Sequence, residues 1–179
     1  MKERMLKIPE GITVKKEGVT LSVKGARGES KRNFFSNDVK IEIRGGEVVI
    51  SASSDRRRVK AVAGTWEAHA KNMFRGAAKG YTAQLKLVYS HFPVKMSIVG
   101  NKFVISNFLG EKQDRYANVL PGVKVEIKKE FIELSGLDKE IVGQTAANIE
   151  AACRIKKKDR RVFADGIWII RKPGMEDGA

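Results

Sequence analysis

Apolar and polar residues alternate in several short segments of the chain, which is the pattern of antiparallel strands with one buried face and one wet face. Pairs of these segments flank short turn signals and predict β-hairpins. The predicted turns are Glu17-Gly18, Gly45-Gly46, Gly100-Asn101, Lys128–Glu130 and Asp165-Gly166. The last hairpin would join Val162–Ala164 to Ile167–Ile169.

Two other segments place apolar residues three or four positions apart, which predicts one amphipathic helix in each half of the chain. The first apolar stripe runs from Val59 to Phe74, and the second from Ile141 to Cys153. The expected helix ends are Ser54 or Asp55 and Gly76 for the first helix, and Asp138 as the N-cap of the second.

The two halves resemble each other when the sequence is shifted by about 84 residues. Val39–Arg44 then falls on Val123–Lys128, and after one residue of slippage Val59 and Ala63 fall on Val142 and Ala146. We therefore predict an α+β fold of two tandem homologous domains, each an antiparallel sheet covered on one face by one helix. The expected domains are residues 1–82 and 83–179.

Charge indicates the class of partner. The 179 residues include 35 Lys and Arg against 21 Asp and Glu, a net charge of +14, which attracts polyanions such as nucleic acid. One cysteine and two histidines exclude an internal disulfide and a structural zinc site. No apolar run approaches the roughly 18 residues of a membrane helix, and no signal peptide is present, so we expect a cytoplasmic protein without a membrane partner.

The sequence contains no recognised catalytic motif, and we expect no cofactor or metal. Cys153 lies on the apolar helix stripe. His69 is interpreted as an ordinary surface or boundary histidine, and His91 as a histidine with a structural hydrogen bond. Glu126, Glu130 and Glu133 lie on or beside one hairpin and are interpreted as solvated. The sequence therefore favours a binding protein over an enzyme.

The basic residues give the candidate binding site. The main cluster follows the second helix and comprises Arg154, Lys156, Lys157, Lys158, Arg160 and Arg161, with Arg171 and Lys172 after the next strand. Weaker candidates are Arg56, Arg57, Arg58, Lys112 and Arg115. A solvated loop is the alternative interpretation of the main cluster. Because aromatics are only 7% of the chain and Trp66 and Trp168 fit core positions, we expect recognition of phosphates and RNA shape, not base stacking.

Four ordered stretches carry a family resemblance: Ser90–Pro93, Asn107–Lys112, Val142–Ala146 and Arg161–Ile169. They resemble the universal protein six of the large ribosomal subunit, in its archaeal and eukaryotic branch. The resemblance covers nearly the whole chain and includes the internal duplication. One departure is Trp168, where tyrosine is expected.

The resemblance implies a non-enzymatic ribosomal protein of the cytoplasm that binds large-subunit rRNA near the translation-factor binding region and the sarcin–ricin loop. It also implies neighbouring ribosomal proteins as partners, with translation factors nearby, and no homo-oligomer. By position, the run from Lys156 to Arg161 together with Lys172 corresponds to the family's C-terminal signature. Two alternatives are a free-standing double-repeat RNA- or DNA-binding module and an enzyme acting on an anionic substrate.

Overall fold

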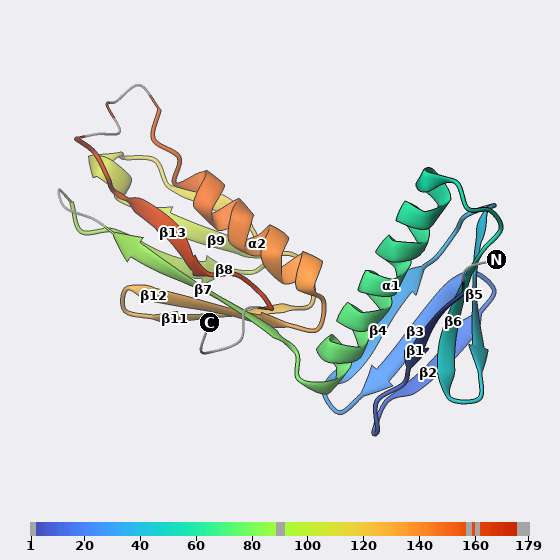
Figure 1. The fold of residues 1–179 in the computed structure, drawn as a ribbon. Coiled ribbons are helices and arrows are strands. Elements are labelled where there is room, and N and C mark those ends of the chain that lie inside the picture. The colour runs from blue at the N-terminus through green and yellow to red at the C-terminus, as the bar shows by residue number, and fades with distance from the viewer. Residues whose placement is uncertain (1–2, 89–91, 157–158, 160–161, 175–179) are drawn as a thin grey trace. The chain divides into compact units, whose positions relative to one another are not determined.

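The chain folds into two compact units, Met1–Gly80 and Tyr81–Ala179. The structure is a computed structural model that describes residues 3–88, 92–156, 159 and 162–174. Each unit has its own hydrophobic core and consists of antiparallel strands and one α-helix (Figure 1). The division lies two residues before the boundary expected from the sequence.

The first unit contains two three-stranded sheets, ordered β1-β6-β5 and β2-β3-β4. Its strands are β1 (Glu3–Lys7), β2 (Thr13–Glu17), β3 (Thr20–Gly25), β4 (Gly28–Asn33), β5 (Val39–Arg44) and β6 (Glu47–Ala52), and its helix is α1 (Arg57–Ala78). The helix packs against strands of both sheets, so one core serves the whole unit.

The second unit repeats this plan with one strand more. Its sheets are ordered β11-β12-β7-β13 and β10-β9-β8. Its elements are β7 (Tyr81–Val88), β8 (Lys95–Val99), β9 (Lys102–Ser106), the 3-10 turn η1 (Phe108–Gly110), β10 (Arg115–Asn118), β11 (Val123–Lys128), β12 (Phe131–Gly136), α2 (Lys139–Ala152) and β13 (Gly166–Arg171). Helix α2 packs on β7, β12 and β13 of one sheet and on β10 of the other (Figure 1).

Matching strand orders confirm the α+β class and the tandem duplication, with two sheets in each unit where one was expected. The registers of equivalent strand pairs show which residues of the two units correspond: Lys7 to Lys86, Thr13 to Lys95 and Val39 to Val123. The sequence offset between corresponding residues therefore increases along the chain, from 79 to 82 and then 84 residues. The uniform shift of 84 misplaces the β2–β3 hairpin by two residues. A two-residue error keeps every side chain on the same face of a strand, and therefore preserves the apolar pattern.

Helix α1 begins and ends differently from the expectation. Its N-cap is Arg56, without a side-chain hydrogen bond, so the prediction of Ser54 or Asp55 is wrong. Gly76 is buried inside the helix, which continues to Ala78 because Gly80, at φ +77°, supplies the left-handed residue that terminates it. In α2 the predicted cap is confirmed, since the Asp138 carboxylate accepts a hydrogen bond from the Glu140 N–H at 2.8 Å.

Four of the predicted hairpins are confirmed, β2–β3, β5–β6, β8–β9 and β11–β12, although the first turn is Gly18-Val19. The prediction of a hairpin at Asp165-Gly166 is wrong. Residues 162–165 form no strand, and β13 pairs instead with β7, about 80 residues earlier in the chain. Asp165 is only 1% exposed and Phe163 packs against the core, so the chain enters the domain here instead of turning at its surface.

Arg115 joins β10 to the C-terminal end of α2. Its guanidinium donates to both carboxylate oxygens of Glu111, at 2.8 and 2.6 Å, and to the backbone carbonyls of Ala152 and Arg154. It also lies over the ring of Phe108, with 4.4 Å from Cζ to the ring centroid. The hydrogen bond to Glu111 raises the pKa of Arg115 above its ordinary value, so the guanidinium stays charged wherever the protein is folded.

The close approach of β3 to α1 gives a first prediction. A Cβ at Gly25 would lie 2.5 Å from the carbonyl oxygen of Ala77, whereas a Cβ at Gly64 would meet only Arg4 atoms at 3.8 Å or more. We expect Gly25→Ala to destabilise the first unit by about 1–3 kcal/mol, and Gly64→Ala to stabilise helix α1 by up to about 1 kcal/mol. Urea denaturation of the full chain, followed by Trp66 fluorescence in a Trp168→Phe background, measures both. Equal stabilities would contradict the close packing at Gly25.

The Arg115 contacts give a second prediction. Arg115→Lys keeps the charge but loses the paired hydrogen bonds, and bonds to charged groups contribute about 1.5–3 kcal/mol. We therefore expect the second unit to lose stability in that range, measured by urea denaturation through Trp168 fluorescence in a Trp66→Phe background. The exposed Lys112→Ala is the control and should change stability by less than about 0.5 kcal/mol. An Arg115→Lys variant as stable as its parent would rule out this role for the guanidinium.

Candidate nucleic-acid interface

The first part of the main basic cluster follows α2. The helix ends at Ala152, Cys153 serves as its C-cap, and Arg154 and Lys156 are exposed beyond it. A cation at this position also interacts favourably with the C-terminal end of the helix dipole. Lys157, Lys158, Arg160 and Arg161 lie outside the described residues.

Arg171 and Lys172 lie at the C-terminal end of β13. Arg171 is the last residue of this strand, which starts at Gly166 and spans about 17 Å at the usual rise per residue, and Lys172 follows it. A Cβ at Gly143 would meet the ring of Pro173 at 3.4 Å, and one at Gly174 would meet Lys139 at 3.2 Å, so the chain after β13 lies beside the first half of α2. The structure therefore brings Arg154 and Lys156 to one end of α2 and Lys172 to the opposite end.

The weaker candidates fall in different environments. Lys112 is exposed in the loop before β10, while the side chain of Arg115 is 19% exposed and bound within the domain. Arg56, Arg57 and Arg58 are exposed at the N-terminus of α1, whose first turn contains no acidic residue. Three cations there oppose the helix dipole. The nearby Asp55 carboxylate forms an ion pair with Lys60 at 3.0 Å.

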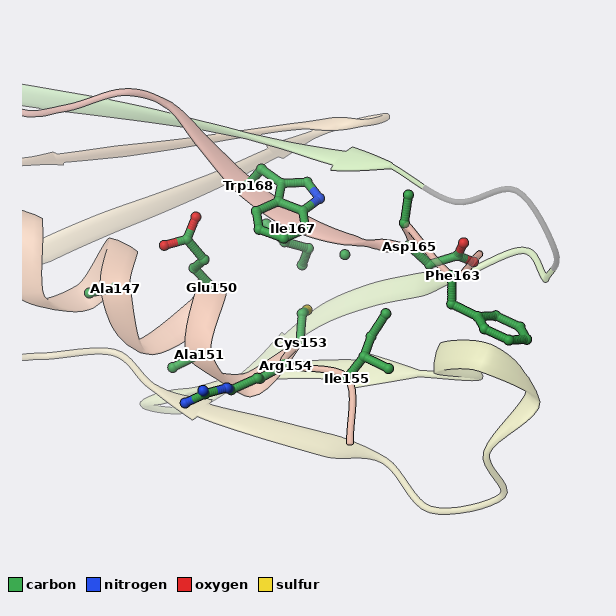
Figure 2. Close-up of a pocket in the computed structure, with 12 residues that line it drawn as sticks. Ala147, Glu150, Ala151, Cys153, Arg154, Ile155, Phe163, Asp165, Ile167 and Trp168 are labelled. Atoms are coloured by element: carbon green, nitrogen blue, oxygen red, sulfur yellow. The ribbon is translucent and has the colours of Figure 1, made fainter. Parts of the chain in front are cut away.

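A pocket of about 670 Å³ lies between the C-terminal turn of α2 and the start of β13 (Figure 2). Its lining includes Glu150, Cys153, Arg154, Asp165 and Trp168. The Glu150 carboxylate accepts a hydrogen bond from the Ile169 N–H at 3.2 Å and so binds the edge of β13 to the helix. Burial raises the pKa of Cys153 to about 11, so its thiol is protonated at neutral pH and acts as a core side chain.

The two tryptophans differ in position. Trp66 is 8% exposed in the core of the first unit, as predicted. Trp168 is 39% exposed, and its predicted core position is wrong. Along β13 the alternation places Ile167, 1% exposed, toward the core and therefore Trp168 on the opposite face. Its indole folds back over Gly166, where a Cβ would lie 3.2 Å from Nε1.

Two glutamates of the β11–β12 hairpin are ion-paired with neighbouring lysines. Glu126 binds Lys124 at 2.8 Å, and Glu133 binds Lys128 at 2.5 Å. The hydrogen bond from Lys124 lowers the pKa of Glu126, so its carboxylate is charged at neutral pH. Both glutamates line a shallow hollow of about 280 Å³ with Gln84 and Arg171.

Within the described part of the chain, no group of three or more His, Cys, Asp or Glu side chains is arranged to hold a metal ion. His69 is half-buried in α1, and His91 lies outside the described residues. No helix among the described residues is both long and apolar enough to cross a membrane.

Comparison with known proteins identifies the family. The family model described as Ribosomal protein L6 matches residues 8–80 and again residues 92–166. One match lies within each of the two structural units.

Individual relatives match over nearly their full length, and each is described as large ribosomal subunit protein uL6. The protein of Methanocella arvoryzae is 43% identical over 172 residues, 96% of this chain and 97% of the relative. The protein of Methanosarcina mazei is 44% identical over 169 residues, which are 94% of this chain and 96% of the relative. The protein of Aeropyrum pernix is 43% identical over 168 residues, which are 93% of this chain and 92% of the relative. The chain therefore belongs to the ribosomal protein L6 family, whose members are structural proteins and not enzymes.

Proposed function

We propose that this protein is a structural constituent of the large ribosomal subunit and binds large-subunit rRNA through its second unit. The observation that carries the proposal is the exposed positive charge at both ends of α2, with Arg154 and Lys156 at one end and Lys172 at the other. These cations project from the ends of a packed helix and a paired strand. A polyanion would therefore meet them at fixed positions, with little further ordering.

Phosphate contacts account for most of this binding. The main cluster comprises Arg154, Lys156, Lys157, Lys158, Arg160 and Arg161. Six cations within eight residues repel one another unless a polyanion lies beside them. Arg171 and Lys172 extend the contact along the domain.

The remaining candidates take different roles in this proposal. Arg115 is a positioning residue, because its bonds to the carbonyls of Ala152 and Arg154 hold the chain that leads into the main cluster. Lys112 and Arg56–Arg58 are exposed and are secondary contacts.

The family resemblance supports the finer location. In this proposal the protein lies near the translation-factor binding region and the sarcin–ricin loop of cytoplasmic ribosomes, beside other large-subunit proteins, and forms no homo-oligomer. Sedimentation of a tagged protein from native lysate tests the assembly itself. Co-migration with large subunits at raised salt is the expected result, whereas a free species of about 20 kDa would favour a module acting outside the ribosome.

The charge cluster gives a third prediction. Replacing Lys156, Lys157 and Lys158 together by Ala removes up to three phosphate contacts, each worth just under one unit in the slope of log affinity against log salt. We expect weaker binding to a transcript of the organism's large-subunit rRNA and a slope reduced by about 2 to 3 units. Filter binding over a range of potassium concentrations gives both quantities.

A matched control keeps the net charge equal. Lys15, Lys16 and Lys40 are exposed lysines of the first unit, and their triple replacement by Ala also removes three charges. It should leave the slope nearly unchanged. If both triple variants reduce the slope equally, general charge and not this cluster governs RNA binding.

A further inference from the structure

The four-stranded sheet of the second unit has one face that α2 does not cover. Strand register places Phe131 of β12, Lys86 of β7 and Trp168 of β13 side by side on that face. Phe131 is 37% exposed and Trp168 is 39% exposed. The Lys86 ammonium lies 5.5 Å from the centroid of the Phe131 ring. We call these three residues the aromatic row.

The first unit shows that the fold does not require this row. In the corresponding β6 and β1 strands, Glu47 takes the place of Phe131 and Lys7 that of Lys86. No strand pairs with the outer edge of β1 among the described residues, so Trp168 has no counterpart there. Exposed aromatic area is unfavourable in water, and two exposed rings side by side on one sheet face, at positions where the other copy has none, indicate a contact surface.

The charges beside the row favour an anionic partner. The carboxylates that β11 and β12 place on this face, Glu126 and Glu133, are bound by Lys124 and Lys128. Glu150, which lines the pocket beside Trp168, accepts a hydrogen bond from the Ile169 N–H. Among the described residues Lys86 has no carboxylate partner, and its ammonium lies over the Phe131 ring. Along β13, Trp168 lies between the basic residues that precede the strand and those that end it.

We propose that unpaired nucleotides of the bound RNA stack their bases on Phe131 and Trp168, while Lys86 contacts the phosphate between them. The inference rests on the proposed rRNA binding and adds a second mode of recognition to it. Unpaired bases expose the flat faces that aromatic rings contact, whereas a duplex keeps its bases stacked internally. An acidic protein segment would use the lysine but would leave both rings without a matching surface.

The test follows Trp168 fluorescence in a Trp66→Phe background, using single-stranded octauridylate as the probe. Stacking should quench the fluorescence, and a blunt RNA duplex of the same length should not. Phe131→Ala should weaken octauridylate binding about 5- to 150-fold, the range measured for loss of one stacked base. Phe35→Ala is the matched control, because Phe35 is 77% exposed in the first unit and should leave binding unchanged.

Variants at position 168 separate stacking from apolar contact. Trp168→Tyr keeps an aromatic face and should retain binding of labelled octauridylate in anisotropy measurements. Trp168→Leu keeps an apolar side chain and should lose it. Circular dichroism melting verifies that both variants are folded, and if either is unfolded, Phe131→Ala decides the question alone.

Two outcomes would overturn the proposal. If octauridylate does not quench Trp168 while rRNA binding keeps its dependence on Lys156–Lys158, the row does not stack on bases, and the proposed function stands. If heptaglutamate quenches Trp168 and octauridylate does not, the row is a contact for an acidic protein segment. Loss of the lysine dependence in rRNA binding would instead count against the proposed function.

Discussion

The packing of one helix against the apolar faces of paired strands is the constraint on which each unit depends. Val59, Ala63, Trp66 and Ala70 of α1 are buried, and so are their counterparts Val142, Ala146, Ile149 and Cys153 at or near α2. Because these side chains fill the space between helix and strands in each unit, a change of volume at these positions costs stability. Recognition therefore has to use what this packing leaves free, namely helix ends, strand edges and the uncovered sheet face.

Duplication lets the second copy differ in those free places while it keeps buried side chains at the equivalent helix positions. Helix α2 spans 14 residues against 22 for α1, and the chain that follows it returns as β13 to pair with β7. The segment from the end of α2 through β13 contains the basic residues before β13, Trp168 within it and Lys172 after it. One added strand thus places cations and an aromatic side chain on the same edge of the domain.

Local patterns in the sequence predict the local structure well. The hairpins with two-residue turns and both apolar helix stripes are present, because alternation and turn residues act over a few positions. The repeat comparison does not detect strand β7, because the 84-residue shift aligns half of it with positions before Met1. The hairpin predicted at Asp165-Gly166 is absent because β13 pairs with β7, which is distant in sequence, and no local pattern specifies such a long-range pairing.

The candidate site shows the same division between local and long-range information. The sequence identifies the basic residues, but only the fold separates them into exposed cations such as Lys156 and the internally bound Arg115. Likewise, an aromatic content of 7% argues against a stacking surface when the residues are counted along the chain. Strand register brings Phe131 and Trp168 onto one face although they are far apart in sequence, so a sparse composition still yields a local concentration of aromatic rings. The proposed stacking depends on that local concentration and not on the average, so it can be inferred from the strand register but not from the composition.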